Sequence, residues 1–346
     1  MLSDLAKKLL HTSGLLALYH RLRNRRVLTV IMFHRVLSEE DPRWASCDPD
    51  YTVSARLFAQ CLDFFKRHYN VVSAEDVLAA HLRGVALPSR PLLVTFDDGW
   101  ADTHDCALPM LLQRGMPALL FVVHDVIGTR QPFFQECLIG AWRLGQIQTG
   151  DLGAALRGEG VAGLPAADQL ASNAEAVLRD LITLLEEAEP ARRTRVLDAL
   201  QGRLDDGLRH WLNHAELSAL EHAGVAIGMH GKTHTPLTRV VDLDTELETA
   251  RALMAQHLPS QVAPVTLSFP HGRYDAAIAR RAHAAGYELV FSSDQVLNPL
   301  QPELGWLLGR CGFETDAVTD REGRLRPELL ALYLFRKPHR GLVRNV

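Results

Sequence analysis

The strongest constraint on the fold is a short apolar run that ends in two acidic residues. Residues 91–96 read Pro-Leu-Leu-Val-Thr-Phe, and Asp97, Asp98 and Gly99 follow directly. An unbroken apolar run bounded by proline and glycine is typical of a strand buried on both faces, as in a parallel sheet. Such sheets carry their functional groups at the carboxyl ends of the strands. The run therefore predicts an α/β protein with both carboxylates at the edge of its sheet.

Two adjacent carboxylates at such an edge repel each other, which limits what they can do together. A cation relieves the repulsion if one carboxylate binds it and the other is left to transfer protons. The alternative is a helix N-cap followed by an acid in the first helical turn. The acidic pair alone does not decide between these interpretations.

Other apolar runs alternate with helical patterns, which is typical of a parallel α/β fold. Between residues 136 and 222 no strand pattern occurs, so we expect a helical insertion at about residues 131–222. The expected strands lie at residues 27–33, 71–72, 118–123, 225–229, 265–269, 288–291 and near 307–313, and the expected helices at about 55–68, 73–82, 102–112, 242–257 and 275–285.

Composition excludes several classes of function. The chain has 346 residues, 47% of them hydrophobic, and a formal net charge of -4, which gives no indication of a nucleic-acid partner. Five scattered cysteines without a CxxC pair argue against a disulfide framework and a thiolate metal site. No run approaches the ~20 apolar residues that cross a bilayer, and no signal-peptide pattern is present. We therefore expect a cytoplasmic protein.

The first 26 residues form a basic, amphipathic segment. Leucines such as Leu5, Leu9 and Leu15 fall on one side of a helix over this segment, and several arginines follow. Packing on the main domain is the more common fate of such a helix, and peripheral contact with the inner membrane surface is the alternative. Residues 321–346 are expected to be a C-terminal tail.

A histidine pair lies beyond another expected strand. His230 follows the run at 225–229, and His234 comes four residues later. Two imidazoles at this spacing can converge on Zn²⁺ or a similar ion, and a carboxylate would complete three ligands and leave room for water and substrate. In a chain with sixteen histidines the pair alone is a weak signal. The acidic pair at a second strand end strengthens it.

Three segments, taken in order, resemble a known family. They are Thr-Phe-Asp-Asp-Gly at 95–99, the histidine pair followed by Thr-Pro-Leu-Thr at 235–238, and Ser-Phe-Pro-His-Gly-Arg-Tyr at 268–274. Together they resemble the polysaccharide deacetylase family, the NodB-homology carbohydrate esterases of family 4, over roughly residues 27–130 and 215–315. The resemblance implies a distorted (β/α)7-type barrel at residues 27–320 and a divalent metal, with Zn²⁺ preferred over Co²⁺ or Ni²⁺. It also implies hydrolysis of an N-acetyl group from an amino sugar.

The resemblance also implies roles for individual residues. Asp97 matches the general base, and Asp98, His230 and His234 match the metal ligands. The turn Pro270-His271-Gly272 matches a motif whose backbone binds the oxyanion, although His271 stands where the family usually has tyrosine.

Two expected groups are not at their usual places. An arginine upstream of Asp97 is missing, and Arg310, near the end of the last expected strand, is our candidate to orient Asp97; a surface salt bridge is the alternative. The general acid of most relatives is a histidine near the C-terminus. Some members are circularly permuted, and His34, at the end of the run at 27–33, matches this acid because the first and last strands of a barrel are neighbours. The alternative for His34 is a structural hydrogen bond to the adjacent loop.

These residues predict a metal-dependent N-deacetylase that acts on an amino-sugar-containing glycan or on a lipid- or nucleotide-linked precursor. One alternative is a deformylase, or another N-deacylase, of a lipid-linked sugar. An alternative of another class is a non-catalytic barrel that binds glycan, against which the intact set of base and ligand residues argues.

Overall fold

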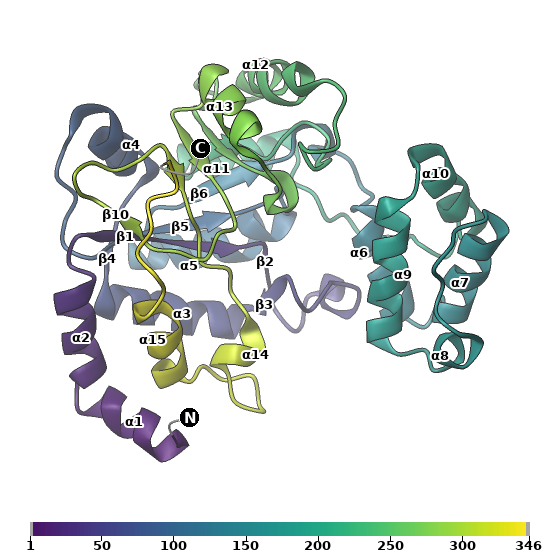
Figure 1. Cartoon of the computed structure of the whole chain (residues 1–346), viewed down its shortest axis with the longest axis horizontal. Coiled ribbons are helices and arrows are strands. Elements are labelled where there is room, and N and C mark those ends of the chain that lie inside the picture. The colour runs from purple at the N-terminus through teal and green to yellow at the C-terminus, as the bar shows by residue number, and fades with distance from the viewer. Residues whose placement is uncertain (1–2, 344–346) are drawn as a thin grey trace. The chain divides into compact units, whose positions relative to one another are not determined.

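The computed structural model describes residues 3–343 of the chain. The chain divides into two compact units. Unit 1 comprises residues 1–38, 50–129 and 212–346, and unit 2 comprises residues 39–49 and 130–211. Figure 1 shows the elements of both units in the colours of the chain.

Unit 1 is built on a parallel sheet that nearly closes into a barrel. The strands run in the order β10-β1-β5-β6-β7-β8-β9-β11, with β4 paired to β5 outside this path. The sheet approaches closure where Cys311, just beyond β11, exchanges backbone hydrogen bonds with Val30 (2.8 Å) and Met32 (3.0 Å) of β1. The expected distorted (β/α) barrel is therefore confirmed. The strands are β1 (Val27–Phe33), β4 (Asn70–Val71), β5 (Pro91–Phe96), β6 (Leu119–Val122), β7 (Ala226–Met229), β8 (Thr266–Ser268), β9 (Leu289–Phe291), β10 (Asn298–Pro299) and β11 (Leu307–Leu308); of these, β10 is antiparallel to β1.

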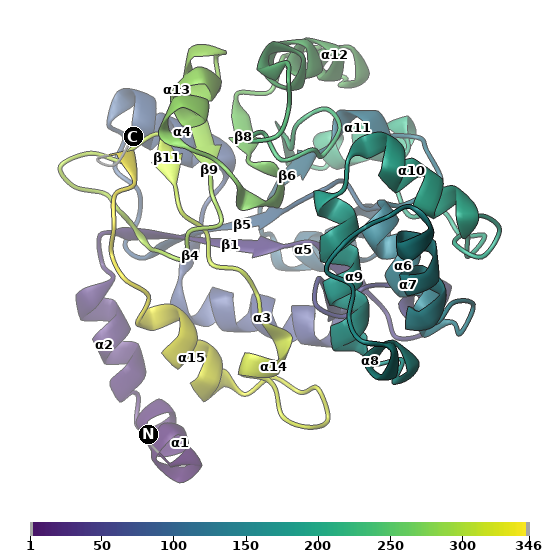
Figure 2. The same cartoon turned by 45° about the vertical axis from the view of Figure 1, so that its right-hand side comes forward.

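Helices follow most of the strands and cover the outside of the sheet (Figure 2). Helix α3 (Ala55–His68) illustrates why the sequence folds this way. The Ser54 side chain caps its first turn, and its apolar residues at helical spacing, among them Leu57, Phe58 and Phe65, are buried. The other main helices of the barrel are α4 (Ala74–Arg83), α5 (Leu108–Arg114), α11 (His214–His222), α12 (Ala250–His257) and α13 (Ala276–Ala284). Shorter elements of unit 1 are β2 (Arg35–Leu37), β3 (Thr52–Ser54), η2 (Thr103–Ala107), η3 (His124–Val126), η4 (Thr245–Thr249), η5 (Pro270–Gly272) and α14 (Thr315–Val318).

The two ends of the chain pack together in unit 1. The N-terminal segment forms two helices, α1 (Asp4–Thr12) and α2 (Leu15–Arg23), because Gly14 between them adopts a positive φ of 77°. Both helices lie along α15 (Pro327–Phe335). Residues 321–346, expected to be a tail, thus include a helix whose Leu330, Leu334 and Phe335 are fully buried. No helix within residues 3–343 is long and apolar enough to cross a membrane.

The named secondary-structure elements of unit 2 are all helices, joined by loops. Its helices are α6 (Phe134–Arg143), α7 (Thr149–Gly158), α8 (Ala167–Ala171), α9 (Glu175–Glu187) and α10 (Pro190–Ala199), with the short helix η1 (Pro42–Ala45) in the segment 39–49. The unit has its own core, in which Leu138, Leu152, Leu178 and Leu185 are fully buried.

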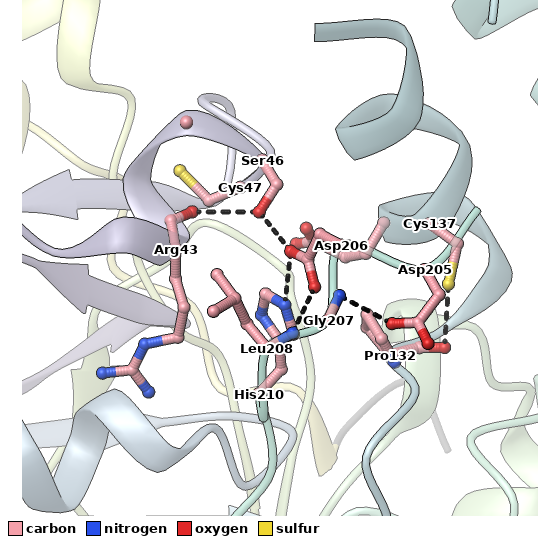
Figure 3. A network of polar contacts seen from close by, with 12 residues as sticks. Arg43, Ser46, Cys47, Pro132, Cys137, Asp205, Asp206, Gly207, Leu208 and His210 are labelled. Atoms are coloured by element: carbon pink, nitrogen blue, oxygen red, sulfur yellow. Dashed lines mark hydrogen bonds and ion pairs between the residues drawn. The ribbon is translucent and has the colours of Figure 1, made fainter. Parts of the chain in front are cut away.

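A polar network joins the two segments of unit 2 (Figure 3). The Asp206 carboxylate accepts hydrogen bonds from the Ser46 hydroxyl (2.6 Å) and the Leu208 N–H (2.9 Å), and its Oδ2 lies 2.9 Å from Nε2 of His210. Burial alone would raise the pKa of Asp206, but these hydrogen bonds outweigh it and hold the pKa below its usual value.

Candidate active site

The residues singled out in the sequence follow strands at one end of the barrel. His34 follows β1, Asp97 follows β5, His230 follows β7, and Arg310 lies just beyond β11. Backbone hydrogen bonding between neighbouring strands continues past the strand ends. The Asp97 N–H donates to the Phe33 carbonyl (3.0 Å), and the His230 N–H donates to the Val122 carbonyl (2.8 Å). Parallel strands present these side chains at their common carboxyl edge.

The side chains of Asp98, His230 and His234 converge on one point. Oδ1 of Asp98 lies 3.4 Å from Nε2 of His230 and 3.3 Å from Nε2 of His234. All three ligand atoms lie within 4.8 Å of one another. One carboxylate oxygen and two imidazole nitrogens are donors that suit Zn²⁺ and related divalent metals.

The orientations of Asp98 and His230 fit a cation. Oδ2 of Asp98 accepts the Trp100 indole N–H (2.9 Å), whereas the buried Oδ1 has no hydrogen-bond partner among the described residues. Nδ1 of His230 lies 2.9 Å from the Ser268 carbonyl. A carbonyl only accepts, so Nδ1 carries the proton and Nε2 turns its lone pair toward Asp98. The residues present therefore fit a divalent metal.

Burial opposes charge on these groups when no cation is bound. It raises the pKa of Asp98 to about 6, and it lowers the pKa of His230 and of His234. A cation compensates a buried carboxylate directly, because it supplies the opposite charge.

The loop that carries His234 is held by a buried carboxylate. Oε2 of Glu246 accepts the N–H groups of Lys232 (2.7 Å) and Thr233 (3.2 Å), and Oε1 accepts the Thr233 hydroxyl (2.7 Å). Both His234 (φ 65°) and Asp98 (φ 77°) adopt left-handed backbone conformations, which are strained for residues other than glycine. The surrounding hydrogen bonds fix this strained arrangement.

Asp97 has a different environment from its neighbour. Nη1 and Nη2 of Arg310 contact its two oxygens at 2.6 and 2.8 Å, and both side chains are buried. Ser268 joins them, because its hydroxyl accepts from Nη2 of Arg310 (2.6 Å). Burial alone would raise the pKa of Asp97, but the charge of Arg310 outweighs it and lowers the pKa to about 2. The alternative of a surface salt bridge for Arg310 is therefore wrong.

His34 borders the cluster and packs edge-on against the Tyr51 ring, with centroids 4.9 Å apart. A positive charge on His34 lowers the pKa of both Asp97 and Asp98, so the ring lies within electrostatic range of the pair. Tyr51 itself is 53% exposed.

The turn at residues 270–272 lies beside the histidine pair. The His271 ring stacks on His234 with centroids 4.5 Å apart. Pro270 has no N–H, and the Gly272 N–H donates to the Phe269 carbonyl (2.9 Å). The His271 N–H stays our candidate oxyanion donor, as the resemblance implied. Only glycine fits at position 272, where a Cβ would lie 1.9 Å from Oγ of Ser293.

Sequence reasoning missed three residues that support this cluster. Ser268 lies within one of the quoted motifs but had no role, and Trp100 directly follows the acidic pair. Trp100 is itself held by the guanidinium of Arg35, which lies 4.3 Å above its ring. Glu246 carries no sequence signal, because nothing local shows that its carboxylate folds back on the loop of His234.

The comparisons with known proteins agree on the fold. No model of a protein family matches the sequence, and no curated protein matches it. Among solved structures, the deacetylase PplD of Streptococcus pyogenes in complex with acetate is 14% identical, with 90% of this chain and 99% of that chain covered and a TM-score of 0.55. IcaB from Ammonifex degensii is 17% identical (90% and 97% covered, TM-score 0.56), and a polysaccharide deacetylase from Bacillus cereus is 12% identical (90% and 69% covered, TM-score 0.54). The chain thus has the fold that its motifs implied.

Proposed function

We propose that this chain, which shares the fold of the polysaccharide deacetylases, is a metal-dependent hydrolase that removes an N-acetyl group from an amino sugar of a glycan or glycan precursor. One observation carries the proposal. The buried Asp97–Arg310 pair lies beside three convergent metal donors, so we assign one carboxylate to proton transfer and the other to a cation.

Asp98, His230 and His234 would hold the metal. A divalent metal in such a site lowers the pKa of water and polarises an amide carbonyl. Asp97, kept ionised by Arg310, accepts a proton from the attacking water. Arg310 is a positioning residue, because it orients this carboxylate through a two-point contact.

Two further groups complete the proposal. The His271 N–H donates to the oxygen of the amide carbonyl as negative charge develops on it. His34 gives a proton to the amine nitrogen as the C–N bond breaks. Water and the N-acetylated sugar are thereby converted to acetate and the free amine.

The similarity of fold supports this choice of substrate. PplD is described as a deacetylase in complex with acetate, and acetate is the acid that deacetylation releases. The polysaccharide deacetylase from Bacillus cereus supports a glycan as the substrate class.

The experiment measures release of free amine from N-acetylated and N-formylated amino-sugar oligomers with Zn²⁺ supplied. We expect the wild type to prefer the N-acetylated substrate. Asp97→Asn should lower the rate by about 10³-fold, whereas Asp63→Asn, an exposed control, should leave it unchanged. Full amine release by Asp97→Asn would contradict the mechanism, and a preference for N-formyl substrates would favour the deformylase alternative.

A further inference from the structure

The N-terminal helices expose an unusual number of large apolar side chains. Six of the thirteen exposed large apolar residues in the described part of the chain fall between residues 5 and 22. Leu5, Leu9 and Leu22 are 69%, 59% and 74% exposed. Burying such side chains is favourable, so a concentration of them on one short segment indicates a contact surface.

These leucines share the outer faces of two helices. Leu15, Leu18 and Leu22 recur at helical spacing on α2, while Leu16 and His20 on its other side are buried. In both views α1 and α2 run beside α15, which covers their inner faces (Figures 1 and 2). We call the outer set the apolar strip, which comprises Leu5, Leu9, Leu15, Leu18 and Leu22.

Unpaired cations accompany the apolar strip. Residues 3–26 contain six lysines and arginines against the single carboxylate of Asp4, although the whole chain has a net charge of -4. Lys7 pairs with Asp4, and Arg23 donates to backbone carbonyls at the C-terminus. The side chains of the other four are exposed and form no hydrogen bond or ion pair with any residue between 3 and 343: Lys8, Arg21, Arg25 and Arg26.

The basic end of this segment opens onto two surface cavities. Arg25 and Arg26 line both of them: one of about 350 Å³ that includes Leu22, and one of about 690 Å³ that includes the exposed Leu82 and Val85. Cationic and apolar side chains therefore line both cavities, and the larger one has room for a lipid headgroup. Both cavities lie at the end of the barrel where β1 and β5 begin, opposite to the end that carries Asp97.

We infer that this surface docks the protein peripherally on an anionic phospholipid bilayer. Leucines on the outer face of such helices enter the boundary between headgroups and acyl chains, and the cations contact lipid phosphates. A second copy of the chain fits less well, because a two-fold interface would bring the unpaired cations of both copies together. Docking in this way leaves the end of the barrel that carries Asp97 open to substrate.

The test is flotation of the full chain with vesicles of phosphatidylcholine alone or with about one third phosphatidylglycerol. Wild type should bind the anionic vesicles and be released by salt. Leu18→Glu/Leu22→Glu should lower the partition coefficient at least about tenfold, and Arg25→Gln/Arg26→Gln about tenfold. The single-substitution controls Leu112→Glu and Arg280→Gln alter exposed residues elsewhere in unit 1 and should bind like the wild type.

Several results would overturn the inference. These are absence of wild-type binding, equal binding to neutral and anionic vesicles, and equal binding by the strip variant and its control. Light scattering covers the remaining alternative. A concentration-dependent dimer that Leu18→Glu/Leu22→Glu abolishes, without vesicle binding, would assign the strip to a second copy. Circular dichroism checks that each variant is folded.

Discussion

Arg310 contacts both carboxylate oxygens of Asp97 across the barrel. Arg310 lies just beyond β11, and Asp97 directly follows β5. The two contacts measure 2.6 and 2.8 Å, and the side chains of Arg310 and Asp97 are only 1% and 2% exposed. Adjacent carboxylates thereby acquire opposite properties. The pKa of Asp97 is lowered to about 2, whereas burial raises that of Asp98 to about 6. Such a divergence between neighbouring acids is how active sites separate their roles.

Arg310→Lys should therefore impair catalysis more than folding. Lysine keeps a charge but lacks the planar fork, so it loses at least one contact to Asp97 or Ser268. We expect kcat to fall about 10- to 100-fold. The pKa of Asp97 should rise without its two-point partner, so the acid limb of the kcat profile should move to higher pH at saturating metal.

The matched control for this prediction is Arg280→Lys on the exposed face of α13. A variant of Arg310 with the wild-type rate and an unshifted acid limb would show that the arginine serves stability alone.

Much of the barrel could be predicted from sequence because its central strands are buried on both faces. Their unbroken apolar runs end sharply at His34, Asp97 and His230, which placed each residue at a strand end. Arg310 was proposed because the arginine that the resemblance implies upstream of Asp97 is missing, and Arg310 lies near the end of the last expected strand. The parallel order of the strands then brings residues far apart in sequence to one edge.

The remaining features depend on tertiary contacts that leave no local pattern. Glu246 is one case, since its partners Lys232 and Thr233 lie 13 or 14 residues away in the chain. Segment 39–49 is another, because its polar sequence is that of a loop. It belongs to the helical unit through Ser46 and Asp206, which are 160 residues apart.

His34→Ala should separate two classes of substrate. A general acid is needed when the leaving group is an amine, but not when it is a good leaving group such as 4-nitrophenolate. We expect amine release to fall about 10²- to 10⁴-fold, while hydrolysis of 4-nitrophenyl acetate changes little. Parallel assays on both substrates measure this, with Asp97→Asn as the variant that loses both activities. Equal losses on the two substrates would assign His34 to another task.

Metal binding should be visible without any assay of activity. A ligand that binds only the folded state raises its stability with ligand concentration, so Zn²⁺ should raise the Tm of the wild type. Asp98→Asn and His230→Gln remove donors and should abolish the increase, with bound zinc measured by atomic absorption. His283→Gln changes a histidine that lies outside the metal donors and stacks on Trp306, so its response to Zn²⁺ should equal that of the wild type. The same Tm response in all four proteins would show that zinc binds elsewhere.

Asp206 should make the stability of unit 2 depend on pH. Its pKa is lower in the folded protein than the usual value of about 3.9 for unfolded chains. The ionised carboxylate therefore stabilises the folded state above about pH 4, and this contribution is lost as the pH falls toward the folded pKa. Asp206→Asn should reduce the free energy of unfolding by about 1–3 kcal/mol at pH 7, because it leaves hydrogen-bond donors such as Ser46 and His210 poorly paired.

The difference from wild type should shrink as the pH falls below about 4, since protonation of the unfolded chain removes the advantage of the native carboxylate. Urea unfolding measures both effects, with hydrogen exchange of the α9 amides reporting unit 2 specifically. Asp205→Asn is the control, because this neighbouring exposed carboxylate loses the same charge but accepts only the Gly207 N–H among the hydrogen bonds drawn in Figure 3. Equal destabilisation by the two variants would show that net charge, and not the Asp206 network, stabilises the unit.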